Sequence, residues 1–268
     1  MVTKAVITCG GYATRFLPVS KAVPKELLPI GDKPVIHYII DELVAAGITD
    51  VLILLGRGRS ALMDYLDQNP ELEAALTRTN SPTCINFFPH VNIYYRRVPM
   101  PRGAADCVWH AKSFIGNEPF IVAYCDDVFF NGNPAQELIT DFQTHNKPAV
   151  IGARVPLVDA HKYGIISRTA AGSVSEIIEK PAQNPPGTLA AAGRYLLTPE
   201  IFTLTEQDMQ NPPPCLSEVC MTRQLNKLAA ADNLRAVKTR ARRYDTGTHE
   251  GLHRANVFFT KTSRRSQS

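Results

Sequence analysis

The sequence predicts an α/β fold, a three-layer sandwich around a mostly parallel sheet with a strand-rich insertion in its second half. In the first half, short unbroken apolar runs alternate with segments of helical spacing, a pattern typical of parallel strands buried on both faces. Beyond Phe142, strands follow one another with little helix between them. We expect a single domain over 1–260 and a basic, disordered tail over 261–268.

The first βαβ unit is expected within the first fifth of the chain. A short apolar strand at 4–8 ends at a glycine pair. Pro34 marks the start of a helix whose apolar side chains recur at helical spacing until Gly47, and an unbroken apolar strand follows at 51–55. The other expected elements are strands at 91–95, 120–124, 149–154, 163–167, 174–179 and 189–197, and helices at 104–114, 199–204, 216–228 and 249–259.

The bulk composition indicates a soluble cytoplasmic protein. The net charge of +4 is mild, which suits a phosphorylated small molecule and does not require a nucleic-acid partner. No segment reaches the roughly 20 apolar residues of a membrane helix. None of the six cysteines belongs to a C-x-x-C pair, so the sequence predicts neither a zinc site nor a disulfide framework.

The segment 10–15, Gly-Gly-Tyr-Ala-Thr-Arg, follows the first strand directly. Glycine lets backbone N–H groups approach phosphate oxygens closely, and Arg15 offers a fork of donors for phosphate. A proline-stiffened loop with Lys21 and Lys25 comes next, so the two segments together suit a triphosphate. Taken alone, the glycine pair is by default a structural turn, and the lysine loop is equally an exposed basic loop.

Three further motifs stand at strand ends or close to a helix start. Asp126-Asp127 ends a buried strand, where carboxylates are suited to Mg²⁺, although aspartate also favours such turns on its own. In Glu179-Lys180-Pro181 the proline is expected to keep Lys180 extended and pointing out of the sheet. Asp245 is either a second metal ligand or a helix cap. Each signal is weak alone, and their order along the chain gives them weight together.

The residues in this order resemble the bacterial UTP–glucose-1-phosphate uridylyltransferases, also called UDP-glucose pyrophosphorylases. The opening blocks 11–18 and 21–29, with Asp32-Lys33-Pro34, are the most specific part, and the similarity spans nearly the whole chain. Further matches, in order, are Glu118-Pro-Phe120, Tyr163-Gly-Ile165, Glu179-Lys-Pro181, Gly193-Arg-Tyr195, Leu197 to Phe202, Arg243-Tyr-Asp245 and Ala255-Asn-Val257. Asp245-Thr-Gly-Thr248 is closer to the related glucose-1-phosphate thymidylyltransferases.

The resemblance implies a Rossmann-like nucleotidyltransferase fold, UTP and glucose-1-phosphate as substrates, Mg²⁺ as cofactor and a homodimer or homotetramer. The sugar phosphate would attack the α-phosphorus of UTP in line and release pyrophosphate. Arg15 and Lys25 would bind the leaving pyrophosphate, Asp126 and Asp245 would hold Mg²⁺, and Lys180 would bind the sugar phosphate. The substrate-binding residues implied are Gly10, Gly11, Thr14, Glu26, Gly103, Gly164, Glu179 and Gly193.

The chain departs from the family pattern at three places. Ala13 stands where the family has glycine in G-x-G-T-R. The segment 96–106, which corresponds to the family's base-reading segment, keeps Gly103 but has no clear counterpart of the expected glutamine. In 212–223, Glu218 and Thr222 match, whereas Arg223 replaces an aspartate. Base and sugar specificity therefore stay open.

Three alternative functions remain beside uridylyl transfer. One is a relative that uses another base, such as that of dTTP, or another sugar. A second is a non-catalytic paralogue that binds nucleotide sugars. The presence of all the candidate catalytic residues counts against it, because genetic drift in a non-catalytic protein would be expected to have removed at least one of them. The third is a sugar-transferring enzyme of similar fold, against which the triphosphate loop counts because a nucleotide-sugar donor carries no γ-phosphate.

Overall fold

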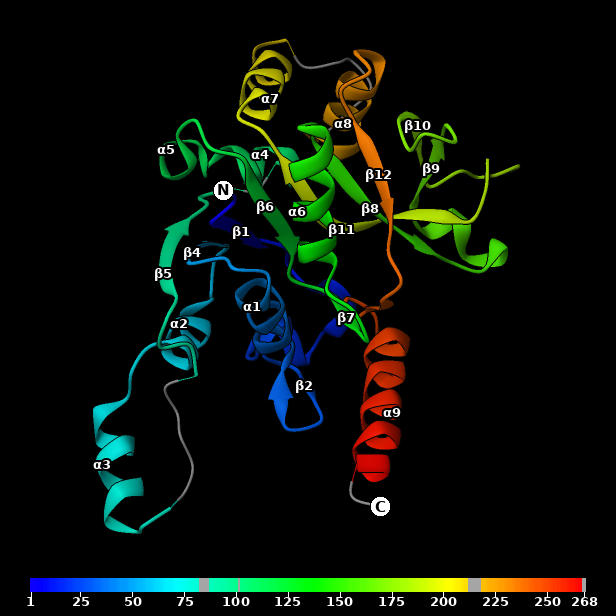
Figure 1. The fold of residues 1–268 in the computed structure, drawn as a ribbon. Helices are drawn as coiled ribbons and strands as arrows, with labels where there is room; N and C mark the ends of the chain where they lie inside the picture. Colours follow the sequence, from blue (N-terminus) through cyan, green and yellow to red (C-terminus); the bar gives the residue numbers. More distant parts are fainter. Residues whose placement is uncertain (82–86, 101, 212–217, 267–268) are drawn as a thin grey trace.

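The computed structural model describes residues 1–81, 87–100, 102–211 and 218–266 (Figure 1). The strands of the main sheet are β1 (Lys4–Cys9), β4 (Asp50–Leu55), β5 (Asn92–Arg97), β6 (Phe120–Tyr124), β8 (Ala149–Arg154), β9 (Gly164–Arg168), β10 (Val174–Glu179), β11 (Leu189–Leu197) and β12 (Arg235–Lys238). Two small sheets pair β2 (Pro29–Ile30) with β3 (Lys33–Pro34) and β7 (Asp127–Phe130) with β13 (Arg242–Asp245). The helices are α1 (Val35–Ala45), α2 (Ser60–Leu66), α3 (Pro70–Arg78), α4 (Ala104–Trp109), α5 (Lys112–Ile115), α6 (Pro134–His145), α7 (Glu200–Gln210), α8 (Met221–Ala230) and α9 (His249–Ser266).

The main sheet is mixed and mostly parallel, as the sequence predicts. β6, β1, β4 and β5 lie side by side and parallel. β11 runs antiparallel between β6 and β8, and β12 continues the sheet parallel to β8. The hairpin of β9 and β10 joins the beginning of β11. Parallel strands release their carboxyl ends at one edge, so the loops after β1 and β6 meet there.

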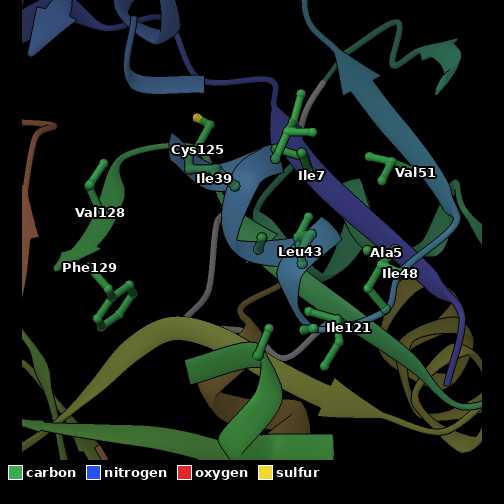
Figure 2. Close-up of a cluster of buried hydrophobic side chains, with 14 of the residues drawn as sticks. Ala5, Ile7, Ile39, Leu43, Ile48, Val51, Ile121, Cys125, Val128 and Phe129 are labelled. Carbon is green, nitrogen blue, oxygen red and sulfur yellow. The ribbon is translucent and has the colours of Figure 1, made fainter. Parts of the chain in front are cut away.

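The alternation of buried side chains along the central strands produces two cores and therefore three layers. In β1, Ala5 and Ile7 belong to one core and Val6 to the other. Figure 2 shows the first core, in which Ile39 and Leu43 of α1 pack over the sheet. α6 covers the same face, whereas α4, α7 and α8 cover the opposite face. Burial on both faces is the reason these strands read as unbroken apolar runs.

The structure confirms most expected elements and adds several. The strands expected at 120–124, 149–154, 174–179 and 189–197 have those bounds. The helix expected at 104–114 is divided into α4 and α5, and the one expected from residue 216 begins at Met221 in α8, residues 212–217 lying outside the described residues. α6 was not predicted, although its signal is present. Asn133 caps the helix by accepting a bond from the Gln136 N–H, and Pro134 takes the first helical position.

The last helix extends into the segment from residue 261 that was expected to be a tail. α9 begins at His249 and continues to Ser266. The helix is held at its middle, where the Asn256 side chain accepts a bond from the Gly31 N–H and donates one to the Pro29 carbonyl. A helix anchored in this way extends its backbone hydrogen bonds into the basic residues that follow. Among the described residues, no helix is long and apolar enough to cross a membrane.

Candidate active site

A cavity of about 630 Å³ opens at the carboxyl ends of β1 and β6, and β9, β10, β11 and β13 enclose it from the other side. Its lining is dense in charge of both signs, which is the composition expected for a phosphate and metal site. Seven residues that the sequence singles out line it, although they come from six separate segments: Arg15, Asp126, Gly164, Glu179, Lys180, Gly193 and Asp245.

Asp126 and Asp245 face each other because β7 pairs with β13. The ladder places Asp127 opposite Asp245, and Thr246 donates both its N–H and its hydroxyl to the Asp126 carbonyl, at 2.7 and 2.9 Å. A Cβ built on Gly247 would lie 2.7 Å from Asp126 Oδ2 and 3.1 Å from Asp245 Oδ1. Both carboxylates therefore reach one small region of space. Two carboxylates combined with phosphate oxygens form a donor set that suits Mg²⁺.

The two carboxylates have opposite electrostatic environments. Burial acts to raise the pKa of Asp126, but the Lys25 ammonium, whose Nζ lies 2.6 Å from Asp126 Oδ2, outweighs it and the pKa falls below its ordinary value. The pKa of Asp245 is raised, first by burial and then by the negative charges of Asp127 and Asp126. Three aspartates, Asp126, Asp127 and Asp245, thus place negative charge close together in this part of the cavity, as a cation site does.

Lys25 lies at the carboxylates and is half-buried. The ion pair with Asp126 raises the pKa of Lys25, although burial alone would lower it. The family resemblance implies that Lys25 binds the leaving pyrophosphate, and the structure places its ammonium beside the candidate metal ligand. The two positions are compatible, since a phosphate bound at the carboxylates would lie within reach of the same ammonium.

Asp127 also lines the cavity and lies opposite Asp245 in the ladder, but its buried carboxylate is bound by two other partners. Its Oδ2 accepts the Gly193 N–H at 2.6 Å, and its Oδ1 pairs with Arg243 Nε at 2.6 Å. The Arg243 guanidinium in turn lies over the Tyr163 ring, 4.5 Å from the ring centroid. A Cβ at Gly193 would come within 2.6 Å of both Asp127 Oδ2 and Tyr124 Cβ, so only glycine fits there. The absence of a side chain at Gly193 therefore allows the Asp127 carboxylate to reach the Gly193 N–H.

Arg194 holds the turn between β6 and β7 from inside the protein. Its side chain is completely buried and pairs bidentately with Glu42, at 2.9 and 3.0 Å. The same guanidinium donates to the carbonyls of Tyr124 and Asp127, which flank the carboxylate turn. Backbone groups on both sides of Asp126 are thereby fixed by one buried cation.

The glycine loop is anchored through its backbone. Arg59 Nη2 donates to the Gly11 carbonyl at 2.6 Å, and Ser20 Oγ donates to the Ala13 carbonyl at 2.8 Å. Ala13 has φ of 53°, in the left-handed region that favours glycine. Thr14 and Arg15 are exposed, and Arg15 reaches the cavity. Gly10 and Gly11 leave this loop open to a ligand.

Glu26 does not lie in the cavity, contrary to the expectation that it contacts substrate. Its side chain is fully buried, with Oε2 3.3 Å from Arg59 Nε and Oε1 accepting from Cys125 Sγ at 3.4 Å. Its buried position beneath the glycine loop gives it a structural role instead. Glu26 holds Arg59, and Arg59 holds the Gly11 carbonyl.

One wall of the cavity is formed by β9, β10 and the start of α8. The Thr222 hydroxyl donates to Glu179 Oε2 at 2.7 Å, and a Cβ at Gly164 would lie 3.1 Å from that same carboxylate oxygen. Lys180 is exposed and lines the cavity. The extended backbone expected for Lys180 is wrong, because its φ is 45° and its N–H donates to the Tyr163 carbonyl. The bend turns the lysine into the cavity.

The two segments that depart from the family pattern lie against each other. Gly103 has φ of 117°, and a Cβ there would lie 2.5 Å from the Val219 carbonyl oxygen. The Val219 N–H donates to the Arg102 carbonyl, and the Val219 carbonyl accepts from the Ala105 N–H. Arg223 points elsewhere and pairs with Asp208. Residues 101 and 212–217, which belong to these segments, lie outside the described residues.

A second group of possible metal ligands lies beneath the loop: Cys9, Glu26 and Cys125, whose ligand atoms lie within 4.8 Å of one another. All three are buried. Thiols are poor partners for Mg²⁺, and Glu26 already pairs with Arg59. This group therefore belongs to the packing under the site.

Four residues organise the cavity through contacts that the sequence motifs did not indicate, although three of them stand within those motifs: Arg59, Asp127, Arg194 and Arg243. Two carried a readable signal. Arg194 is a charged residue within an otherwise apolar strand, and such a residue needs a buried partner. Asp127 follows Asp126 directly, and adjacent residues entering a strand point to opposite faces. Arg59 and Arg243 lie in segments without periodicity, and only the fold shows their partners.

A cavity lined by carboxylates and cations at the carboxyl edge of a mostly parallel sheet is typical of enzymes that act on nucleotides. The family model described as nucleotidyl transferase matches residues 4–262, and the chain belongs to this family. UTP–glucose-1-phosphate uridylyltransferase 2 of Streptococcus pyogenes is 36% identical over 270 residues, covering 96% of this chain and 89% of the relative. UTP–glucose-1-phosphate uridylyltransferase of Staphylococcus epidermidis is 36% identical over 266 residues, covering 96% and 91%.

Solved structures support the same assignment of fold. A UDP-glucose pyrophosphorylase complexed with UDP-glucose superposes with a TM-score of 0.86 at 31% identity, covering 98% of this chain and all of the other. A UTP-bound enzyme of this type from Acinetobacter baumannii gives a TM-score of 0.85 at 27% identity, covering 97% and 93%. The predicted Rossmann-like nucleotidyltransferase fold is confirmed.

Proposed function

We propose that this protein transfers the uridylyl group of UTP to glucose-1-phosphate, giving UDP-glucose and pyrophosphate. The observation that carries the proposal is the convergence, in one cavity, of the phosphate-loop Arg15, the carboxylate pair Asp126 and Asp245, and the sugar-side Glu179 and Lys180. The relatives named above, which span nearly the whole chain, carry the same activity in their names.

The chain's own residues would act by positioning and charge neutralisation. The backbone of the glycine loop and Arg15 bind the triphosphate, and Lys180 holds the sugar phosphate in line with the α-phosphorus. Asp126 and Asp245 would hold Mg²⁺, which when bound neutralises charge on the phosphate oxygens. Lys25, already beside Asp126, stabilises the negative charge that develops on the leaving pyrophosphate. Nothing in this arrangement requires a covalent enzyme intermediate.

Glu179 is positioned to accept hydrogen bonds from sugar hydroxyls. Its Oε2 is held by Thr222, which orients the carboxylate at the cavity wall. Gly164 leaves space beside that oxygen, since a side chain there would meet it at 3.1 Å. These contacts support a hexose phosphate as the acceptor.

A second candidate is transfer to or from another base or sugar, as with dTTP. The contact between the altered segments, through Gly103 and Val219, supports it, because Ala104 and Glu218 beside them line the cavity. We further propose a homodimer or homotetramer in the cytoplasm. The free thiols of Cys9, Cys107, Cys125 and Cys220, the cysteines that the structure describes, are consistent with a reducing compartment.

The test is pyrophosphate release with Mg²⁺ and glucose-1-phosphate, using UTP, dTTP, CTP, ATP and GTP in turn. We expect release with UTP and at least tenfold less with each other base, a difference of about 1.4 kcal/mol. Comparable release with dTTP would favour the second candidate. No release with any base and any hexose-1-phosphate would overturn both and leave a nucleotide-sugar-binding protein.

The same assay checks the metal pair. Asp126→Ala should abolish turnover while the circular dichroism spectrum keeps its native form, and the melting temperature should fall only by the amount due to the lost ion pair with Lys25. Asp232→Ala is a matched control, because Asp232 is an exposed aspartate paired with Lys147 far from the cavity. Near-normal turnover in Asp126→Ala would remove Asp126 from the metal site.

A further inference from the structure

A second cavity, of about 400 Å³, lies beside the strand-rich insertion. Three cations line it, and each is the last residue of its strand: Arg154 of β8, Arg168 of β9 and Lys238 of β12. The start of β11 forms the remaining wall, since Leu189 pairs with Arg154 in the ladder. The groove therefore lies where the carboxyl ends of three strands meet, which is also where ligand sites lie in α/β folds.

The charge in this groove is not compensated. None of its ten lining residues is acidic, and none of the three cations forms an ion pair within the described part of the chain. Arg168 donates through Nη1 to the Ala236 carbonyl, which orients its guanidinium without neutralising it. Three exposed cations gathered without a carboxylate produce a positive potential in the groove that favours a bound anion.

The neighbouring basic residues show that the lack of acidic partners is specific to the groove. Arg235, at the opposite end of β12 from Lys238, pairs bidentately with Asp141 at 2.8 and 2.9 Å. Lys147, just before β8, pairs with Asp232. The basic residues at the starts of β8 and β12 thus have acidic partners, whereas those at their ends, in the groove, have none within the described residues.

The groove also offers neutral donors and a connection to the active site. Ser167, Ser175 and Thr188 also line it, and hydroxyl groups of such residues complete phosphate sites by donating to the oxygens that cations leave free. Arg154 lines both this groove and the catalytic cavity. A ligand that binds Arg154 in the groove would draw its charge away from the cavity.

We propose that this groove is a second anion site, which binds a small molecule carrying a diphosphate group. Two arginine forks and a lysine match the several charged oxygens of a diphosphate better than a single monoanion, and the volume limits the ligand to a small molecule. The proposal concerns binding outside the catalytic cavity, so it stands or falls separately from the transferase activity.

The experiment is isothermal titration calorimetry of the full chain with inorganic pyrophosphate, at constant ionic strength and without Mg²⁺. The groove variant is Arg168→Gln with Lys238→Gln, which spares Arg154 because Arg154 also lines the catalytic cavity. The control is Arg78→Gln with Lys261→Gln, two exposed cations elsewhere, which gives the same change in net charge. Arg15→Gln separates binding at the catalytic loop from binding in the groove.

We expect the groove variant to weaken one binding event by about tenfold or more, the loss typical of charge-assisted contacts. The control should change affinity by less than about twofold, and the event should persist in Arg15→Gln. Equal affinity in the groove variant and the wild type would overturn the proposal. Loss of all pyrophosphate binding in Arg15→Gln would overturn it as well, because binding would then occur at the catalytic loop alone.

Discussion

The two ends of the catalytic cavity are built differently. At the end where Mg²⁺ is proposed to bind, here called the metal end, Asp126 and Asp127 are held by charged partners, the buried Arg194 fixes the carbonyls on both sides, and β13 pairs with β7. At the end where the triphosphate is proposed to bind, here called the nucleotide end, the loop 10–15 is largely exposed and its carbonyls accept side-chain bonds from Arg59, Ser20 and His249.

The difference indicates where stability and where affinity are determined. The neighbouring carboxylates of the metal end repel one another when no ligand is bound. Buried charged partners are therefore needed to keep the turn in its geometry. A loop that wraps a triphosphate through its backbone N–H groups needs open donors, so its side chains stay free. Substitutions behind the metal end should therefore change folding, and those in the loop should change binding.

The largest effect is expected from the buried cation behind the metal end. Arg194→Met leaves Glu42 buried without its partner and frees the carbonyls of Tyr124 and Asp127. Breaking a buried pair of this kind costs about 3–5 kcal/mol in the free energy of unfolding. Urea unfolding monitored by tryptophan fluorescence and circular dichroism measures it.

The control for that variant is Arg235→Met, which breaks another bidentate arginine pair. Both Arg235 and Asp141 keep 14% of their side-chain surface exposed, whereas Arg194 keeps none. Water can reach the abandoned Asp141, so we expect a clearly smaller loss. Equal losses in the two variants would mean that burial of Arg194 does not set the stability of the metal end.

The next effect is catalytic. Lys25→Ala removes the ammonium beside Asp126 and should raise the activation free energy by about 2–4 kcal/mol, as the loss of a preorganised charge contact does. The measurement is kcat/KM for UTP at saturating Mg²⁺. Lys21→Ala in the same loop is the control, because Lys21 is exposed, and it should stay near the wild-type rate. A loss below about tenfold for Lys25→Ala would remove that lysine from the site.

Local patterns were sufficient to predict the parts of the site that follow strand ends. The carboxyl edge of a parallel sheet gathers the loops after its strands, so the phosphate loop and Asp126 are predictable from apolar runs and the residues that end them. The proximity of Asp126 and Asp245, in contrast, could not be predicted from local patterns. It depends on β13, a four-residue strand with the sequence Arg-Arg-Tyr-Asp, which has no apolar alternation to mark it.

Partners separated by a long stretch of chain were beyond prediction for the same reason. Arg194 meets Glu42 across 152 residues, and Glu26 meets Arg59 through a loop without periodicity. Glu26 shows the limit of motif reasoning most clearly. Its place in a site motif indicated a contact with substrate, yet full burial makes it a support for Arg59. A motif identifies which residues matter, and the packing decides what each one does.

A smaller effect of opposite sign is expected within the metal pair. The pKa of Asp245 is raised, so the folded chain binds a proton there that the unfolded chain has lost, and stability falls as the pH rises from about 3.8 through the raised pKa. Asp245→Asn should therefore stabilise the metal-free chain above that range, by about 1 kcal/mol. At lower pH the gain should vanish. Urea titrations from pH 3 to 8 with a chelator present measure it.

Asp126→Asn, measured in the same urea titrations, should change the stability in the opposite direction. The pKa of Asp126 is lowered, so its stabilising effect is present above the ordinary value of 3.8 and is lost as the pH falls through the lowered pKa. Its asparagine variant should be destabilised at neutral pH, where Lys25 loses its partner. Two variants that shift stability in the same direction at pH 7 would contradict the opposite environments of this pair.

The smallest effect is expected in the loop, from Ala13→Gly. Alanine pays about 1–2 kcal/mol for the left-handed backbone that Ala13 adopts, but glycine also loses more chain entropy on folding, so the net gain in stability should stay below about 1 kcal/mol. The gain should be clearer in a lower KM for UTP, because the methyl group leaves a segment where the backbone approaches phosphate. Asn146→Gly is the control, being left-handed at the end of α6 and far from the cavity in sequence and sheet position. An unchanged KM in Ala13→Gly would mean that the loop already binds the triphosphate without strain, and that the nucleotide end of the cavity is as preformed as the metal end.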